Sequence, residues 1–190
     1  MNKTTLFLLL SFITLLFLGC ETKTIEVPQD VNITQNYLIQ KRLVSYASKS
    51  DEKILTTLAY EYPTPNATYR LHFIAQIPMH KNDHLITPNK PHYYLRITRH
   101  GQQWKEFMKI TSATFYGLHL QPRYSNIRHG RYFEEYTVEF ALKTLQNTPK
   151  KTLHFTLYNA KQQKQHISIK SIYLSAFLKI LEQESSSISP

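Results

Sequence analysis

Cysteine, glycine and acidic residues are scarce in this sequence, and each shortage excludes a class of protein. A single Cys cannot form a disulfide within the chain, so a disulfide-stabilised scaffold is excluded. Only four Gly are present, which excludes a collagen-like chain and argues against glycine-rich phosphate loops. The 13 acidic residues face 23 Lys and Arg, for a formal net charge of +10. A hydrophobic content of 42% is nevertheless too high for a disordered polycation, and 190 residues suit one domain with appendages.

The amino terminus has the pattern of a secretory signal peptide. Lys3 supplies a positive charge, and the apolar run from Leu6 to Leu18 is interrupted only by Ser11 and Thr14. The run falls within the ~7–15 residues of a signal-peptide core and is shorter than the ~20 residues that span a bilayer. It leads directly into Gly19-Cys20.

The segment Leu16-Phe17-Leu18-Gly19-Cys20 resembles the lipobox of bacterial prolipoproteins. In that family the Cys thiol is lipidated, the chain is cleaved before the Cys, and the new amino terminus is acylated. The resemblance implies cleavage between Gly19 and Cys20, with acyl chains such as palmitate on Cys20. It also implies the periplasmic face of the outer membrane of a Gram-negative bacterium, with inner-membrane retention as the alternative. An ordinary signal peptide followed by an unrelated free Cys is the other alternative.

Composition divides the chain into four predicted segments. We expect a lipoprotein signal peptide over 1–19, a lipidated Cys and flexible tether over 20–36, a single β-rich domain over 37–184, and a disordered tail over 185–190. The tether is polar and contains Pro28, and the tail is rich in Ser. No further cofactor is expected beyond the covalent lipid.

Alternation of apolar and polar residues dominates the predicted domain and indicates strands. The predicted strands cover residues 37–47, 53–62, 69–77, 93–98, 104–110, 136–140, 153–158 and 167–169. Pro63 is expected to end the second of these, residues 78–91 to form a loop with three prolines, and residues 100–103 to form a hairpin turn.

One helix is predicted after the last strand. Ser171 can cap it, and Leu174, Phe177, Leu178 and Leu181 form an apolar stripe. A short helical turn is also possible over 142–147. Seven to nine strands and a terminal helix predict a mainly β chain, an antiparallel β-sandwich or barrel-like domain with a C-terminal α-helix packed across it.

Residues 92–181 are similar to a group of uncharacterised proteobacterial envelope lipoproteins. The similarity lies in Tyr-x-Leu-x-Ile-x-Arg at 93–99, Gly101 with Trp104, Leu-x-Phe-x-Leu-Tyr at 153–158, and the start of the predicted helix at Tyr173. It implies the fold and the location of the chain, and it implies no activity.

Candidate catalytic and metal-binding residues form no recognised motif. His80 and His84 have the four-residue spacing of helical zinc ligands, but the neighbouring prolines argue against a helix, so both are weak candidates. The sequence contains no Gly-x-Ser-x-Gly element, and lipidation would consume the only Cys. Glu134 and Glu135 would point to opposite faces of a strand. We therefore expect no catalytic residues, with a small periplasmic hydrolase or a His-dependent metal-binding protein as the alternative.

Basic residues are concentrated between Arg123 and Phe133, where arginines alternate with rings. Arginine binds phosphate and carboxylate groups through its planar fork of donors. Five arginines are candidates for an anionic ligand: Arg96, Arg99, Arg123, Arg128 and Arg131. The expected partners are anionic lipid, lipopolysaccharide, peptidoglycan or another envelope protein, and nucleic acid is not expected in that compartment. The sequence thus predicts a non-enzymatic binding or assembly module, and a solvated strand face without a ligand is the alternative.

Overall fold

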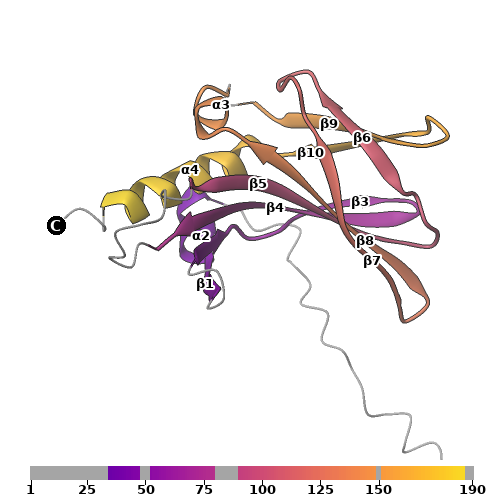
Figure 1. The fold of residues 1–190 in the computed structure, drawn as a ribbon, viewed down its shortest axis with the longest axis horizontal. Coiled ribbons are helices and arrows are strands. Elements are labelled where there is room, and N and C mark those ends of the chain that lie inside the picture. The colour runs from indigo at the N-terminus through magenta and orange to yellow at the C-terminus, as the bar shows by residue number, and fades with distance from the viewer. Residues whose placement is uncertain (1–33, 48–51, 80–89, 149–150, 187–190) are drawn as a thin grey trace, which may run out of the picture. The chain divides into compact units, whose positions relative to one another are not determined.

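Two antiparallel sheets and three helices form the part of the chain that the computed structural model describes, which comprises residues 34–47, 52–79, 90–148 and 151–186 (Figure 1). The larger sheet has seven strands in the order β1-β2-β4-β5-β8-β7, with β3 also paired to β4. The smaller sheet has the order β10-β9-β6. The strands are β1 (Leu43–Ala47), β2 (Glu52–Thr56), β3 (Tyr60–Thr64), β4 (Ala67–Pro78), β5 (His92–Gly101), β6 (Phe107–Ser112), β7 (Leu120–Arg128), β8 (Arg131–Phe140), β9 (Leu153–Asn159) and β10 (Lys164–Ile169). The helices are α2 (Gln35–Gln40), α3 (Leu142–Gln146) and α4 (Ser171–Ser186).

The larger sheet buries one face, which we call the inner face. Alternate residues of its central strands point to this face because strand side chains have a period of two. Leu71 and Phe73 of β4, Leu95 and Ile97 of β5, and Val138 of β8 are all fully buried there. The opposite, outer face carries the intervening residues, which are mostly polar.

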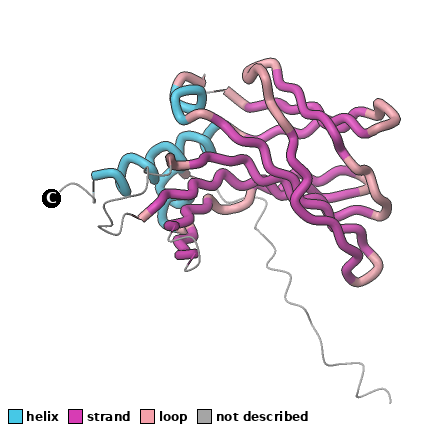
Figure 2. Tube along the Cα trace, viewed as in Figure 1, coloured by secondary structure: helices cyan, strands magenta, loops and turns pink. Residues whose placement is uncertain are grey.

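The smaller sheet and α4 cover the inner face (Figures 1 and 2). The Phe115 ring lies 5.0 Å from the ring of Phe140 on the larger sheet and 5.9 Å from the ring of Phe155 on the smaller one. Phe177 of α4 stacks on Phe73 of β4 with 5.5 Å between ring centroids. The predicted mainly β sandwich with a C-terminal helix is therefore confirmed, and the described parts of the two sheets do not close into a barrel.

Ion pairs fasten the end of α4 to the beginning of the domain. The Glu184 carboxylate accepts from Lys53 of β2 and lies 3.4 Å from Arg42. The hydrogen bond from Lys53 is the main reason that the pKa of Glu184 lies below its ordinary value. In the described ranges, no helix has both the length and the apolar character needed to cross a bilayer.

The predicted strand over 37–47 is wrong in its first half, which forms α2. The Thr34 side chain caps this helix by accepting from the Tyr37 N–H at 3.2 Å. Leu38 and Ile39 are adjacent in sequence and both buried, which a strand buried on one face does not allow. The helix packs against α4, with the Gln35 amide donating to the Ser175 carbonyl at 3.0 Å.

The predicted hairpin over 100–103 is also wrong. β5 pairs with β4 and β8, whereas β6 pairs with β9, so the chain crosses from one sheet to the other after Gly101. The next strand begins at Phe107 instead of residue 104. The predicted segment over 53–62 is two strands, and Pro63 lies within β3 because that strand pairs on one side only.

Several segment boundaries differ from the predictions. α2 begins inside the predicted tether, and Ser185 belongs to α4 instead of the tail. Ser171 is the first residue of α4 instead of its cap, and Ile180 is buried more deeply than Leu178 or Leu181. The helical turn near 142–147 is confirmed as α3. The signal peptide, Gly19, Cys20, the tether up to residue 33, loop residues 80–89 and the tail from residue 187 lie outside the described residues.

Candidate anion-binding surface

The hairpin between β7 and β8 positions two of the candidate arginines. His129 and Gly130 form its two-residue turn with φ angles of 48° and 70°. Positive φ at both central residues is characteristic of a type I′ turn, in which glycine carries no steric penalty. Arg128 and Arg131 flank this turn and are directly paired across the two strands. Their Cβ atoms are therefore neighbours, at about 4.5–5.5 Å in such a pair.

Aromatic rings support the Arg128 side chain on the outer face. Its guanidinium carbon lies 5.0 Å from the centroid of the Phe133 ring and 5.9 Å from that of Tyr124. The His100 ring contacts Phe133 edge to face at 4.8 Å. We call these five residues the arginine–aromatic surface: His100, Tyr124, Arg128, Arg131 and Phe133.

The electrostatics of this surface are dominated by positive charge. Partial burial lowers the pKa of His100, and the nearby charges of Arg70, Arg131 and Arg128 lower it further. Arg70 is paired with the Glu61 carboxylate at 2.8 Å. Neither Arg128 nor Arg131 has a carboxylate at ion-pair distance among the described residues. Two arginines at directly paired positions therefore share one face without a carboxylate partner among the described residues.

Hydrogen bonds orient the Tyr124 hydroxyl at the edge of this surface. The Asn126 side-chain amide donates to it at 2.6 Å. Hydrogen bonds from Arg128 and Asn126 lower the pKa of Tyr124, because they stabilise the phenolate form. The hydroxyl oxygen is thus used as an acceptor within the surface.

Arg96 and Arg123 lie on the same outer face, farther along the strands from the turn. Arg96 is paired across the sheet with Thr137, and its Nε lies 3.5 Å from a Glu135 oxygen. Arg123 Nε donates to the Thr137 hydroxyl at 2.9 Å, from a position where a bulge interrupts the register of β7. Arg96 therefore has a carboxylate partner and Arg123 a hydroxyl partner, whereas Arg128 and Arg131 have no carboxylate at ion-pair distance among the described residues.

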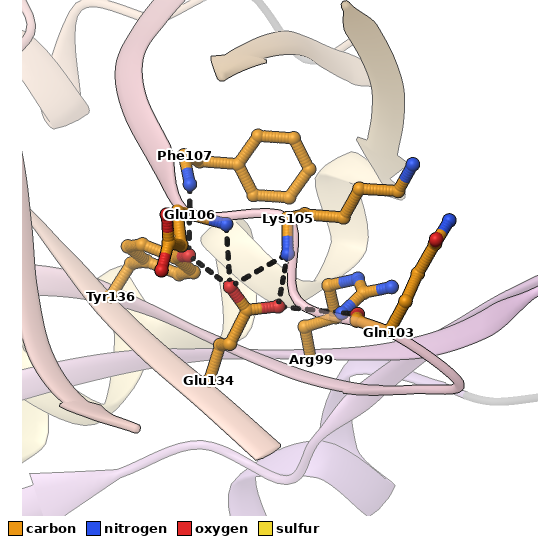
Figure 3. A network of polar contacts seen from close by, with 7 residues as sticks. All are labelled: Arg99, Gln103, Lys105, Glu106, Phe107, Glu134 and Tyr136. Atoms are coloured by element: carbon orange, nitrogen blue, oxygen red, sulfur yellow. Dashed lines mark hydrogen bonds and ion pairs between the residues drawn. The ribbon is translucent and has the colours of Figure 1, made fainter. Parts of the chain in front are cut away.

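Arg99 is not part of any exposed surface, which corrects its prediction as a ligand-binding residue. Its side chain is 1% exposed and lies on the inner face. One guanidinium nitrogen donates to Glu134 at 2.5 Å and to the Gln103 carbonyl at 2.8 Å (Figure 3). A Cβ atom on Gly101 would overlap the guanidinium group, so any larger residue at that position requires the Arg99 side chain to shift.

The Glu134 carboxylate fixes the segment that crosses between the sheets. It accepts from the backbone N–H groups of Lys105 at 3.2 Å and Glu106 at 2.7 Å, and from the Tyr136 hydroxyl at 2.8 Å (Figure 3). The Phe107 N–H in turn donates to the Tyr136 hydroxyl at 3.0 Å. Burial and the adjacent carboxylate raise the pKa of Tyr136 above its ordinary value. Glu134 therefore acts as a structural anchor for residues 105–107.

The alternation of side chains along a strand could have shown from the sequence that Arg99 and Glu134 lie on the buried face. Arg99 is two residues from Ile97 and Glu134 is two residues from Tyr136, so each shares the face of a buried neighbour. Glu134 and Glu135 do point to opposite faces, as predicted. What the sequence could not supply is the pairing of β5 with β8, which brings the two charges together.

The other candidates for acid–base or metal chemistry are dispersed. Glu139 pairs with His92 at 2.6 Å on the outer face. Among the described residues, no group of three or more His, Cys, Asp and Glu side chains is arranged to hold a metal ion. His80 and His84 lie outside the described residues, so the weak metal prediction stays a prediction.

Comparisons with protein-family models, with curated proteins and with solved structures gave no match for this chain. The function is therefore inferred from the geometry of the chain itself. The arginine–aromatic surface is the place where unbalanced charge, defined backbone geometry and exposed donors coincide.

Proposed function

We propose that this chain is a lipid-anchored protein of the bacterial cell envelope that binds anionic groups through the arginine–aromatic surface and has no catalytic role. One observation carries the proposal: Arg128 and Arg131 are held side by side across a hairpin with no carboxylate partner in the described residues. Like charges directly opposite each other destabilise a strand pair. A bound anion would remove that repulsion.

The donors of this pair suit oxygen-rich anions. A guanidinium group presents its N–H donors in a plane, which matches the oxygens of a phosphate or carboxylate. The Phe133 and Tyr124 rings hold the Arg128 guanidinium in position, so less side-chain freedom is lost when a ligand binds. Arg123, whose hydrogen-bond partner is the uncharged Thr137 hydroxyl, adds positive charge farther along the same face.

The proposed location rests on the lipobox at Gly19-Cys20 and supplies the ligand class. Several acyl chains on Cys20 would hold the chain at a bilayer surface, since each buried CH₂ contributes about 0.8 kcal/mol. The chain that begins at Cys20 lacks Lys3, so it has 22 Lys and Arg against 13 Asp and Glu. Its net charge of +9 attracts it to anionic headgroups at such a surface. The proposed ligands are the phosphate groups of anionic lipid or lipopolysaccharide, with peptidoglycan carboxylates as a competing source.

Binding should be measured with residues 20–190 carrying Cys20→Ala, because acyl chains on Cys20 or the apolar run over residues 6–18 would enter any bilayer. We expect it to sediment with vesicles that contain phosphatidylglycerol and to remain in solution with pure phosphatidylcholine vesicles. Salt should weaken this binding. Parallel measurements with lipopolysaccharide and with purified peptidoglycan would identify the source of the anionic groups.

The matched comparison uses two double variants that remove the same charge. Arg128→Ala/Arg131→Ala should reduce vesicle binding strongly. Lys143→Ala/Lys161→Ala removes two exposed cations from α3 and the β9–β10 turn and should retain most of the binding. Equal losses in the two double variants would show that net charge alone attracts the chain, and the proposed site would be wrong.

The anchor has a separate test. The wild-type chain should partition into the membrane fraction of cells and carry acyl groups, and Cys20→Ala should abolish the acylation. A wild-type chain that stays soluble and unacylated would contradict the proposed anchor without affecting the vesicle experiment.

A further inference from the structure

A small polar cavity, which we call the niche, adjoins the arginine–aromatic surface. The turn between β3 and β4 lies against the end of β5, where the Gln102 N–H donates to the Asn66 carbonyl at 3.4 Å. The niche at this place has a volume of about 150 Å³. Pockets that hold drug-sized ligands have about 300–1,000 Å³, so the niche has room for one small group only. Its polar lining includes Asn66, Thr68, His100, Gln102 and Arg131.

The side chains that line the niche can donate hydrogen bonds. Thr68 of β4 is directly paired with His100 of β5, and Arg131 reaches the niche from the beginning of β8. In the described part of the chain, no hydrogen bond engages the side chains of Asn66, Thr68 or Gln102. Amide, hydroxyl and guanidinium groups all carry N–H or O–H donors. The niche therefore suits a small group that is rich in acceptor oxygens.

The charge around the niche is positive. None of the described residues that line it is acidic. Arg131 and Arg128 both lower the pKa of His100, so the charges of both arginines act inside the niche. Glu61 acts on His100 in the opposite direction, but its carboxylate accepts from Arg70 at 2.8 Å, which balances its charge. An anionic group is therefore favoured over a neutral one.

We propose that the niche, with Arg128 and Arg131 at its border, binds the terminal phosphate of a phosphate monoester in preference to a phosphate diester. This inference rests on the proposed function, because Arg131 belongs both to the niche and to the arginine–aromatic surface. A monoester has three unsubstituted oxygens and one organic substituent. Its oxygens can enter a small niche while the substituent points to solvent. A diester carries substituents on two oxygens, and the niche has no room for the second.

The number of charges also favours a monoester. The second pKa of a phosphate monoester is about 6, so the group carries about −1.5 to −2 at pH 7. A diester carries a single negative charge. Arg128 and Arg131 are directly paired across β7 and β8, so two positive charges are available on one side of the niche. A monoester can balance both.

Vesicle sedimentation with residues 20–190 carrying Cys20→Ala tests the preference. Phosphatidylcholine vesicles would contain either phosphatidic acid, a monoester, or phosphatidylglycerol, a diester, in amounts that give equal surface potential. We expect about tenfold tighter binding to phosphatidic acid, because one further hydrogen bond to a charged group typically contributes about that factor. Equal surface potential removes the contribution of long-range attraction from this comparison.

Variants without a change in charge assign the preference to the niche. Thr68→Val removes one donor and should reduce binding of phosphatidic acid to the level of phosphatidylglycerol, which itself should not change. Asn66→Ala should have the same effect. Thr111→Val makes the identical substitution at a half-buried position on β6 of the smaller sheet and should keep the preference.

Soluble phosphates separate the phosphate group from the bilayer as the source of recognition. Glycerol 3-phosphate should displace the chain from phosphatidic acid vesicles, whereas the diester glycerophosphoglycerol should not. Displacement by both or by neither would overturn the proposal. So would equal binding to the two lipids, or a preference that survives Thr68→Val and Asn66→Ala. Each of these results leaves binding by Arg128 and Arg131 intact, whereas no binding to either lipid would contradict the proposed function itself and this inference with it.

Discussion

Arginines lie on both faces of the larger sheet. The charge of the arginine on the inner face is balanced by a carboxylate, whereas the charges of two arginines on the outer face have no such partner. Arg99 on the inner face is buried and bonded to Glu134, and the backbone of Gly101 lies against its guanidinium group. Arg128 and Arg131 on the outer face are exposed and have aromatic rings and each other as neighbours. A buried charge requires a partner built into the fold, whereas an exposed one can take its partner from solution.

This difference in partners distinguishes a structural role from a binding role among the candidate arginines. Composition and proximity in sequence placed Arg99 with the other candidates. Arg99 is no longer a candidate, because its guanidinium group is buried and bonded to the Glu134 carboxylate, where a ligand in solution cannot reach it. The pair that lacks such a partner is the better candidate for function.

The largest effect is expected from breaking the inner network. Glu134→Met would leave Arg99 buried without a counter-charge and the N–H of Glu106 without an acceptor. Loss of one member of a buried ion pair typically costs about 3–5 kcal/mol. Denaturant unfolding should show this loss for Glu134→Met. Glu135→Met on the outer face should cost about 1 kcal/mol or less, since its ion pair is partly exposed. Equal losses of unfolding free energy in the two variants would show that the inner ion pair is no more important for stability than the outer one.

An intermediate effect is expected where the chain lies against Arg99. Gly101→Ala places a methyl group into the Arg99 guanidinium and should destabilise the fold by about 1–3 kcal/mol, the usual range for overpacking. In an Arg99→Met background the same substitution should cost less, because the obstructing group is gone. A double-mutant cycle measures this coupling, and additive costs would show that the two positions are independent.

A smaller effect of opposite sign is expected on the outer face. Arg131→Glu replaces a like-charged cross-strand pair with an oppositely charged one, which should stabilise the hairpin by about 0.2–1 kcal/mol. The same substitution should abolish binding to phosphatidylglycerol vesicles in residues 20–190 carrying Cys20→Ala. Lys161→Glu makes an equal change in net charge and should retain more of the binding. Destabilisation by Arg131→Glu would show that the two arginines do not repel each other.

The smallest contrast concerns histidines and pH. The His72 ring nitrogen contacts the Thr57 carbonyl at 3.0 Å, and burial lowers the pKa of this residue below its ordinary 6.5. The unfolded chain therefore binds a proton more readily than the folded chain. Stability from this group is present above about pH 6.5 and is lost as the pH falls toward the folded-state pKa. His72→Phe should flatten the slope of unfolding free energy against pH, and a slope equal to that of the wild type would contradict this role of His72.

Much of the sheet could be predicted from sequence because its central strands have a buried and a less buried face. The alternation in β4, β5, β8 and β9 follows from that geometry. It fails for α2, whose adjacent buried residues Leu38 and Ile39 are explained by packing against α4. The predicted hairpin turn after Gly101 is wrong for another reason. A local turn signal cannot show that the chain crosses from one sheet to the other.

The candidate site could be predicted in part. The cluster of arginines and rings between residues 123 and 133 is local and visible in the sequence. Its place on the hairpin of β7 and β8 was not predicted, because no strand was expected between residues 110 and 136. The direct pairing of Arg128 with Arg131 depends on the two-residue turn at His129 and Gly130. The removal of Arg99 from the candidates depends on Glu134, which lies 35 residues away in sequence.

The most direct test of the outer-face assignment is the pKa of His100, measured by NMR with and without pyrophosphate. Positive charge from Arg70, Arg131 and Arg128 helps to hold that pKa down. Pyrophosphate bound beside Arg128 and Arg131 would neutralise part of this charge, so the pKa of His100 should rise. In Arg128→Ala/Arg131→Ala the pKa should already be higher and should not respond. An unchanged His100 pKa at saturating pyrophosphate would contradict anion binding at this surface.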